Sequence, residues 1–257
     1  MNLICSPELA VHLKSASQKV RVISEAWFTG EGYCLNCSSD RLEPTTAGTI
    51  ARDYFCPVCG QPYELKSSAR AHKRVVNDGG YDSMMRRIRD AEAPALMLMH
   101  YSPEWCVQGL IAIHPIFLTP AVVIKRKNAH TRPGSGVKYQ MCDLDLSLIP
   151  SDGKIAVVRD GQAYPTATTR TAFRESMRFC DIPLTKRGWA AMVLSAVRKI
   201  GKKQFTLTEV YAHEESMHAA YPENSHIRDK IRQQLQVLRD LGYIEFLDKR
   251  GGYRVLL

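Results

Sequence analysis

Four cysteines in two closely spaced pairs constrain this chain more than any other feature of its sequence. Cys34 and Cys37 form one pair, Cys56 and Cys59 form the other, and 18 residues separate the pairs. This spacing matches the C-x₂-C-x₁₅₋₂₀-C-x₂-C pattern of a tetrahedral zinc site, in which each short turn directs two sulfurs at one ion. Because four thiolates close the coordination shell, no position remains for a catalytic water. We therefore predict a structural Zn²⁺ held by these four cysteines.

The other four cysteines do not share this spacing. Cys5, Cys106, Cys142 and Cys180 lie far apart among apolar neighbours, so we expect free thiols. The chain starts without a basic segment followed by an apolar core, and it has no run of about 20 apolar residues. These features predict a cytoplasmic protein without a membrane partner, in a compartment that favours thiolates over disulfides.

The charge of the chain favours a polyanionic partner. Of its 257 residues, 45% are hydrophobic and 24% charged, which is typical of a folded globular protein. Lys and Arg number 35 against 26 Asp and Glu, giving a net charge of +9. Residues 184–257 contain 13 basic and 8 acidic residues, so they carry +5 of that excess. A nucleic acid is the partner class that such a distribution favours, with its main contacts near the carboxyl end.

Three charged residues flank the second cysteine pair. Residues 62–66 read as a strand, so Glu64 and Lys66 project from one face while Leu65 faces the core. If Asp53 lies on the neighbouring strand of a hairpin whose tip is the cysteine turn, two carboxylates and one ammonium converge. That group suits Mg²⁺ and phosphodiester hydrolysis, with the lysine assisting the attacking water. Taken alone, the pattern also fits an ordinary solvated strand.

The last quarter of the chain has the pattern of a winged-helix unit. Apolar residues at helical spacing predict a first helix over 186–200. Thr206 starts a capping box that opens a second helix ending near residue 221, and a third helix is expected over 226–241. Two short apolar strands joined by a basic glycine turn follow and complete the motif.

The third helix of this unit has one apolar face and one polar face. Its Ile227, Ile231, Leu235 and Leu238 are expected to face inward. The long polar side chains suit phosphates and base edges in the major groove. The predicted DNA-binding residues of this helix and of the following turn are His226, Arg228, Lys230, Arg232, Gln233, Gln234, Lys249 and Arg250. Winged helices also bind proteins, so the pattern alone leaves that alternative open.

The middle of the chain alternates short apolar runs with polar turns. Strands are expected over 95–100, 107–114, 121–125 and 154–159, and a basic helix over 81–92. The segment 125–136 is rich in Lys, Arg, Gly and Pro and is predicted to be a loop. Such a loop either tracks a phosphate backbone or is simply solvated.

Several of these motifs together resemble the DpnI-like methyl-directed restriction endonucleases, nearly end to end. The resemblance rests on Ser17-Gln18-Lys19, Glu25-x-Trp27, the four paired cysteines, Glu64-Leu65-Lys66-Ser67, Asn77-Asp78-Gly79 and the run from His226 to Asp240. It implies an α/β (α+β) fold: a PD-(D/E)xK nuclease domain over 1–183 with an inserted four-cysteine zinc ribbon, and a small winged-helix domain over 184–257. Two features differ from the family pattern, since Arg52 replaces the proline before Asp53 and no tryptophan lies near Lys138.

The resemblance also implies site residues and an activity. Asp53, Glu64 and Lys66 become the catalytic triad, with Asp53 and Glu64 holding Mg²⁺. Both domains would bind double-stranded DNA that contains N6-methyladenine in GATC, and the nuclease domain would cut it as a monomeric type II site-specific deoxyribonuclease. The alternative is a zinc-ribbon winged-helix transcription regulator without nuclease activity, in which Glu64 and Lys66 are surface residues.

Overall fold

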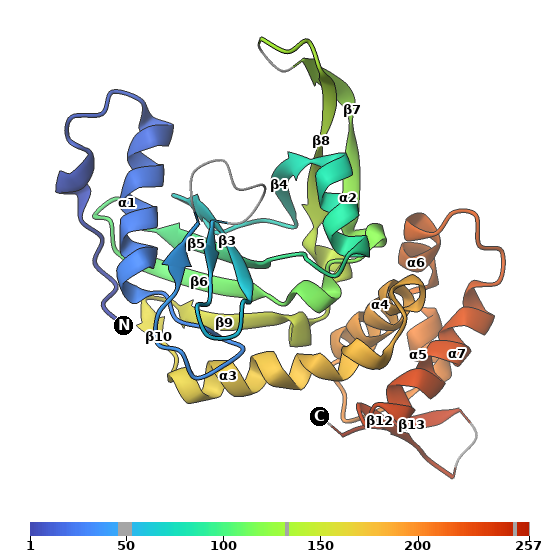
Figure 1. Cartoon of the computed structure of the whole chain (residues 1–257). Helices are drawn as coiled ribbons and strands as arrows, with labels where there is room; N and C mark the ends of the chain where they lie inside the picture. Colours follow the sequence, from blue (N-terminus) through green and yellow to red (C-terminus); the bar gives the residue numbers. More distant parts are fainter. Residues whose placement is uncertain (46–52, 132–133, 249–250, 257) are drawn as a thin grey trace.

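The computed structural model describes residues 1–45, 53–131, 134–248 and 251–256, and its main body is a mixed sheet flanked by helices (Figure 1). Within the described residues the sheet has seven strands in the order β1-β2-β3-β5-β6-β9-β10. Its strands are β1 (Glu43–Pro44), β2 (Tyr54–Phe55), β3 (Pro62–Ser68), β5 (Ala95–Tyr101), β6 (Val107–Ile113), β9 (Lys154–Arg159) and β10 (Gln162–Ala163). Only β3 and β5 run parallel, and the other neighbours in this sheet are antiparallel.

Each face of this sheet is covered by a different helix. The odd-numbered side chains of β5, such as Met97, belong to one core cluster with Phe28 of α1 (Ala16–Glu31). The even-numbered side chains, such as Leu98, belong to a second cluster with Met84 of α2 (Tyr81–Arg89). Glu64 is in register with Leu96, and Lys66 with Leu98. Because neighbouring strands share the pleat, Glu64 and Lys66 project from the α2 face.

A second sheet extends from the body as a long hairpin. It has the order β4-β8-β7, with β4 (Val75–Gly80), β7 (Val123–Thr131) and β8 (Lys138–Asp145). The β7–β8 hairpin projects away from the main sheet (Figure 1). The prediction of a loop from residue 125 was wrong as far as residue 131. Those polar residues pair with β8, for example His130 with Tyr139, and such backbone pairing does not require an apolar face on an exposed hairpin.

The carboxyl-terminal unit has the expected helices and hairpin. Its elements are α4 (Leu184–Ile200), β11 (Gln204–Thr206), α5 (Leu207–Tyr211), α6 (Glu214–Ala220), α7 (Ile227–Asp240), β12 (Ile244–Phe246) and β13 (Gly252–Val255). The Thr206–Glu209 capping box is present at the start of α5. The second predicted helix is divided into α5 and α6, since helical bonding breaks around His213. With the sheet order β11-β13-β12, the unit is a winged helix, which confirms the predicted mixed α/β class with a helical appendage.

The winged-helix unit packs directly against the main body. Every residue of α4 from Gly188 to Val197 is buried, and one core cluster joins Leu194 and Leu238 to Phe117 and Phe179. A helix buried on all sides is expected where two layers enclose it. The predicted division after residue 183 coincides with the start of α4, but it remains a prediction because the core is continuous across it.

The remaining elements are one helix, whose Phe173 is buried in the same core cluster as Phe28, and several short turns. They are α3 (Thr166–Glu175) and the 3₁₀ turns η1 (Pro7–Ala10), η2 (Pro115–Phe117), η3 (Pro120–Val122), η4 (Leu146–Leu148), η5 (Ser151–Gly153) and η6 (Ser176–Asp181). In the part of the chain that the structure describes, no helix combines the length and the apolar character that crossing a bilayer requires.

Candidate nuclease site and metal centre

The β2–β3 hairpin carries both predicted sites. Tyr54 of β2 pairs with Tyr63 of β3, and both rings are buried in the α1 cluster. The turn between the strands contains Cys56 and Cys59, and Gly60 has a φ of +74°, the left-handed conformation that favours glycine. The predicted hairpin with a cysteine turn at its tip is therefore present.

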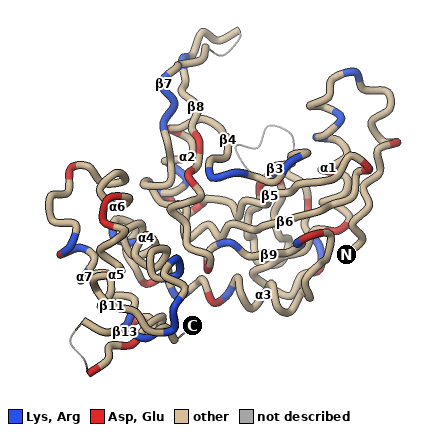
Figure 2. The backbone as a smooth tube through the Cα atoms, turned by 180° about the vertical axis from the view of Figure 1, so that it is seen from behind, with Lys and Arg blue, Asp and Glu red and all other residues tan. Residues whose placement is uncertain are grey.

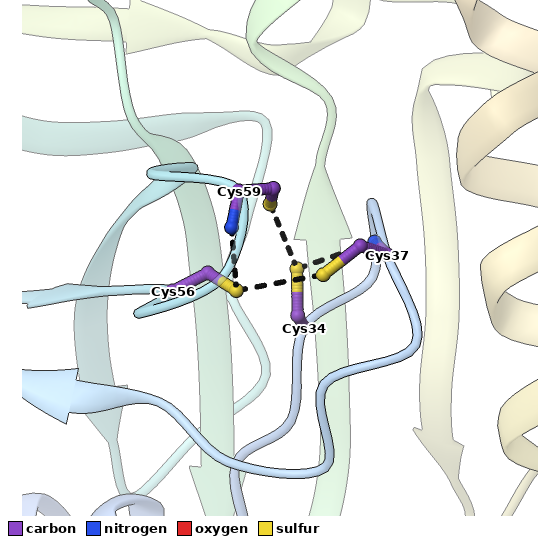
Figure 3. A group of neighbouring side chains, drawn as sticks. All are labelled: Cys34, Cys37, Cys56 and Cys59. Carbon is purple, nitrogen blue, oxygen red and sulfur yellow. Dashed lines mark hydrogen bonds between the residues drawn. The ribbon is translucent and has the colours of Figure 1, made fainter.

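The four paired cysteines meet at this tip (Figure 3). Their sulfur atoms all lie within 4.8 Å of one another, with 3.6 Å between Cys34 and Cys59 and 3.5 Å between Cys37 and Cys56. Zn–S bonds of about 2.3 Å in a tetrahedron place sulfurs about 3.8 Å apart, so the group fits a closed zinc site.

Backbone amides prepare one of these sulfurs, that of Cys56, to bind a cation. The amides of Val58 and Cys59 donate to Cys56 Sγ at 3.4 and 3.5 Å. Burial raises the pKa of the Cys56 thiol, but these amide donors and the hydrogen bonds with Cys37 and Cys34 together lower the pKa to about 6. At Cys34 and Cys37, burial prevails and raises the pKa of the thiol. Arg170 of α3 donates to the carbonyl oxygens of Cys34 and Ser39 at 2.9 and 2.7 Å, which fixes the first cysteine loop against the body.

The three predicted catalytic residues are brought together at the base of the same hairpin. Lys66 Nζ donates to Glu64 Oε1 at 2.8 Å. Asp53 Oδ2 accepts from the amide of Leu65 at 2.9 Å, so its carboxylate is held beside Glu64. Both carboxylates line a cavity of about 700 Å³ that also includes Glu25 of α1. Carboxylate oxygens facing an open cavity are suitable ligands for a hard divalent cation such as Mg²⁺.

Two further charged residues complete this cluster, and sequence reasoning missed them as site residues. Asp78 of β4 accepts from Lys66 Nζ at 2.8 Å and is 6% exposed. Arg87 of α2 is 7% exposed, and its Nη1 lies 3.9 Å from Glu64 Oε2. A bulge between Asn77 and Gly80 interrupts the pairing of β4 with β8, and bulges commonly redirect a side chain beside an active site.

The sequence contains a signal for each missed residue. Arg87 lies three residues after Met84 and one before Ile88, on the buried face of α2, where an unpaired guanidinium would be costly. Asp78 stands between an asparagine and two glycines, a composition that disfavours a regular strand interior.

Burial and mutual attraction set the charge states in the cluster. Burial raises the pKa of Glu64, and the ammonium of Lys66 opposes this rise. Burial on its own would lower the pKa of Lys66, but Glu64 and Asp78 together raise it above the usual lysine value. Lys66 is therefore a hydrogen-bond donor with a fixed positive charge in this arrangement. Asp53, Glu64 and Asp78 oppose Lys66 and Arg87, so the described cluster has one net negative charge.

The predicted DNA-binding residues of the winged helix lie mainly on the exposed face of α7. His226, Arg228, Arg232 and Gln233 are exposed and Lys230 is half-buried. Arg228 forms a 2.8 Å ion pair with Glu214. Arg232 forms an ion pair with Asp229 and donates a hydrogen bond to the hydroxyl oxygen of Tyr211 at 3.1 Å. Lys249 and Arg250 lie outside the described residues.

The prediction for Gln234 was wrong. Its side chain is 1% exposed and lies on the inner face of α7 with Ile227, Ile231, Leu235 and Leu238. These residues repeat at the three- and four-residue spacing of the buried helix face. Gln234 shares this spacing, so its place on the helix buries its side chain although the amide is polar. Gln234 therefore cannot reach a DNA groove in this conformation.

Two comparisons with protein families decide which family the chain belongs to. The model of the Dam-replacing family matches residues 1–180, and the model of the Dam-replacing HTH domain matches residues 185–255. The chain belongs to the Dam-replacing family. This assignment confirms the resemblance to the DpnI-like endonucleases.

Membership in the Dam-replacing family gives the coarse function. A Dam-replacing protein with both matched parts is a restriction endonuclease with a DNA-binding helix-turn-helix domain. The alternative of a regulator without nuclease activity is not favoured, because the longer match covers the part with Asp53, Glu64 and Lys66.

Proposed function

We propose that the chain is a Mg²⁺-dependent endonuclease that cleaves double-stranded DNA containing a methylated base, N6-methyladenine in GATC. The single observation that supports this proposal most is the convergence of Asp53, Glu64 and Lys66 beside an open cavity on one hairpin. Two carboxylates and an ammonium provide the ligands and the donor that phosphodiester hydrolysis requires.

The donor atoms distinguish the two metal sites that we propose. Asp53 and Glu64 offer hard carboxylate oxygens and would hold Mg²⁺, whereas the four thiolates of the hairpin tip would hold Zn²⁺. When bound, Mg²⁺ supplies positive charge that stabilises phosphate oxygens and lowers the pKa of a coordinated water. The negative charge that remains in the protein cluster favours a cation at this position.

We assign to Lys66 the role of stabilising the negative charge that develops on the phosphate during hydrolysis. Two of its three N–H groups are directed at Glu64 and Asp78, both at 2.8 Å. If Glu64 turns toward a cation, Asp78 still anchors the ammonium, which is then free to donate to a phosphate oxygen or to the attacking water. Arg87 holds the other side of Glu64. In-line attack by water would leave a 5′-phosphate and a 3′-hydroxyl.

Selectivity for methylated DNA is best explained by two methyl-reading surfaces in one monomer. Burying one methyl group contributes about 0.8 kcal/mol, which corresponds to only about fourfold discrimination. Two independent readers, one in the nuclease part and one in the winged helix, would multiply this factor to about fifteenfold. The exposed face of α7 supplies the donors for the second reader.

Plasmid cleavage tests the proposal. The full chain is incubated with Mg²⁺ and either Dam-methylated or unmethylated plasmid of the same sequence. We expect the methylated plasmid to be cleaved at least about fifteenfold faster than the unmethylated one, with fragment ends that map within GATC. Equal cutting of both plasmids would contradict methyl direction, and binding without cutting of either would contradict the nuclease function itself.

A further inference from the structure

A second cavity lies between the main sheet and the winged-helix unit. Its volume is about 610 Å³, within the range of about 300 to 1,000 Å³ that is usual for small-molecule sites. Its walls come from β5, β6 and β9, from the segment before β4, from the η4–η5 connection and from the end of α4. No residue of the candidate catalytic cluster lines it.

The charged side chains that line this cavity are all basic in the described part of the chain. The lining includes five basic residues, Lys73, Arg74, Lys154, Arg198 and Lys199. No Asp or Glu lines it within the described part of the chain. Figure 2 shows basic positions on β9 and beside α4, and both elements contribute residues to the lining of the cavity. The cavity beside Asp53 and Glu64 has the opposite character, since three carboxylates and a single basic residue line it within the described part of the chain.

Three of these five cations, Lys73, Lys154 and Lys199, form no ion pair among the described residues. Arg74 is paired with Asp145 and Arg198 with Asp152. Burial lowers the pKa of Lys154 and the neighbouring Lys199 lowers it further, while Asp145 opposes both with the smallest effect of the three. Two ammonium groups that repel each other in a partly buried site favour a bound anion.

The floor of the cavity is aliphatic and partly open to water. It consists of Leu98, Ile111, Ile113, Leu146 and Ile149. Ile111 is 40% exposed although it lies on a central strand of the sheet, so an apolar surface there is uncovered. Hydroxyls of Ser147, Ser151 and Ser195 also line the cavity. Ser147 and Ser151 donate to Asp145 and Asp152 at 2.6 and 3.4 Å, so in the described structure the Ser195 hydroxyl is the one of the three that is left to donate to an anion.

We propose that this cavity binds an organic phosphate of mononucleotide size. The phosphate lies between Lys154 and Lys199, and the flat apolar part of the ligand covers Ile111 and the neighbouring aliphatic floor. The phosphate belongs either to a free nucleotide or to a nucleotide of a DNA strand, since both present the same chemistry. The site is separate from the proposed nuclease site and does not depend on that function.

The position of the cavity links it to both parts of the chain. His72 lines it, and the Nε2 atom of His72 lies 3.2 Å from the carbonyl oxygen of Lys66 and 3.1 Å from that of Met99. Ser195 and Lys199 belong to α4 of the winged-helix unit. An occupant therefore contacts the segment that is hydrogen-bonded to the catalytic strand as well as the DNA-binding unit.

Calorimetric titration of the full chain with dAMP, without added Mg²⁺, tests the proposal. We expect one dAMP per chain, with deoxyadenosine and inorganic phosphate each binding at least about tenfold more weakly, because each lacks one half of the ligand. Absence of dAMP binding at millimolar concentration would overturn the proposal. Inorganic phosphate that binds as tightly as dAMP would do the same, since the aliphatic floor would then have no role.

A matched pair of variants locates the bound ligand. Ile111→Glu places a carboxylate in the cavity, whereas Ile124→Glu makes the same change at a residue of β7 that is 41% exposed and lies outside it. We expect Ile111→Glu to lose dAMP binding at least tenfold and Ile124→Glu to retain it, with both variants melting near the wild-type temperature. Lys154→Met is expected to weaken binding about tenfold. Equal affinity of wild type and Ile111→Glu would refute this location.

Competition distinguishes the two sources of the phosphate. A short unmethylated duplex is added to the complex of wild-type protein with dAMP. Displacement of dAMP by the duplex assigns the cavity to a DNA strand. Simultaneous binding of dAMP and duplex assigns it to a free nucleotide.

Discussion

The two clusters on the β2–β3 hairpin differ in how the chain assembles them. The cysteine cluster at the tip uses four identical ligands from one short stretch of sequence, and its geometry follows from two tight turns. The charged cluster at the base combines residues of that hairpin with Asp78 of β4 and Arg87 of α2. The tip is therefore determined mainly by nearby residues, with Arg170 of α3 bracing its first loop, while the base depends on how distant elements pack. Variants in the two clusters should fail in different ways.

Loss of the Lys66 ammonium should produce the largest effect and should leave the tip intact. Lys66→Ala is expected to lower the single-turnover cleavage rate of methylated DNA about 1,000-fold, because a donor to the developing charge is removed. DNA affinity, measured by fluorescence anisotropy, should change less than about threefold. Lys14→Ala, which removes an exposed ammonium elsewhere, is the control. Weakened binding combined with residual wild-type cutting would contradict the role of Lys66.

Loss of a cysteine ligand should instead act through the fold. Cys34→Ser is expected to lower the zinc content from one ion per chain and to reduce the melting temperature by more than about 10 °C, since metal binding contributes directly to folding free energy. Cleavage would fall with the folded fraction, because both clusters share the hairpin. Cys180→Ser, at an exposed cysteine outside the cluster, should change neither quantity. Unchanged melting in the Cys34 variant would show that the tip does not stabilise the hairpin.

Asp78 tests whether a residue from outside the hairpin positions Lys66. Asp78→Asn keeps the side-chain size and removes the charge that holds the ammonium at 2.8 Å. We expect kcat to fall about tenfold to thirtyfold with little change in the DNA dissociation constant. Asp160→Asn is a suitable control, because Asp160 is exposed and its φ of +51° is a conformation that asparagine tolerates. If Asp78→Asn kept the wild-type kcat, Asp78 would not position Lys66, and the charged cluster would be determined by the β2–β3 hairpin alone.

The same distinction explains how much the sequence could predict. Spacing predicted the cysteine site, and alternation with a common strand face predicted that Glu64 and Lys66 meet. Asp78 could not be assigned, because it reaches Lys66 only through a bulge in a strand of another sheet. The β7–β8 hairpin was also missed, since backbone pairing alone holds its polar residues as strands.

The smallest expected effect concerns the DNA contacts of α7. Its exposed face carries Arg228, whereas the polar Gln234 lies on its buried face. Arg228→Ala should remove about one phosphate contact, so the slope of log K against log salt should decrease by about 0.9 and affinity should fall several-fold.

Gln234→Met should leave that slope unchanged. Its Oε1 has no hydrogen-bond partner within the described structure, so replacing the amide by an apolar chain of similar size should not lower the melting temperature. Because α4 shares the hydrophobic core of the nuclease part, such point variants test the DNA interface without the unfolding that deletion of 184–257 would cause. A reduced salt slope in Gln234→Met would show that α7 rotates on DNA and that the buried amide becomes a contact.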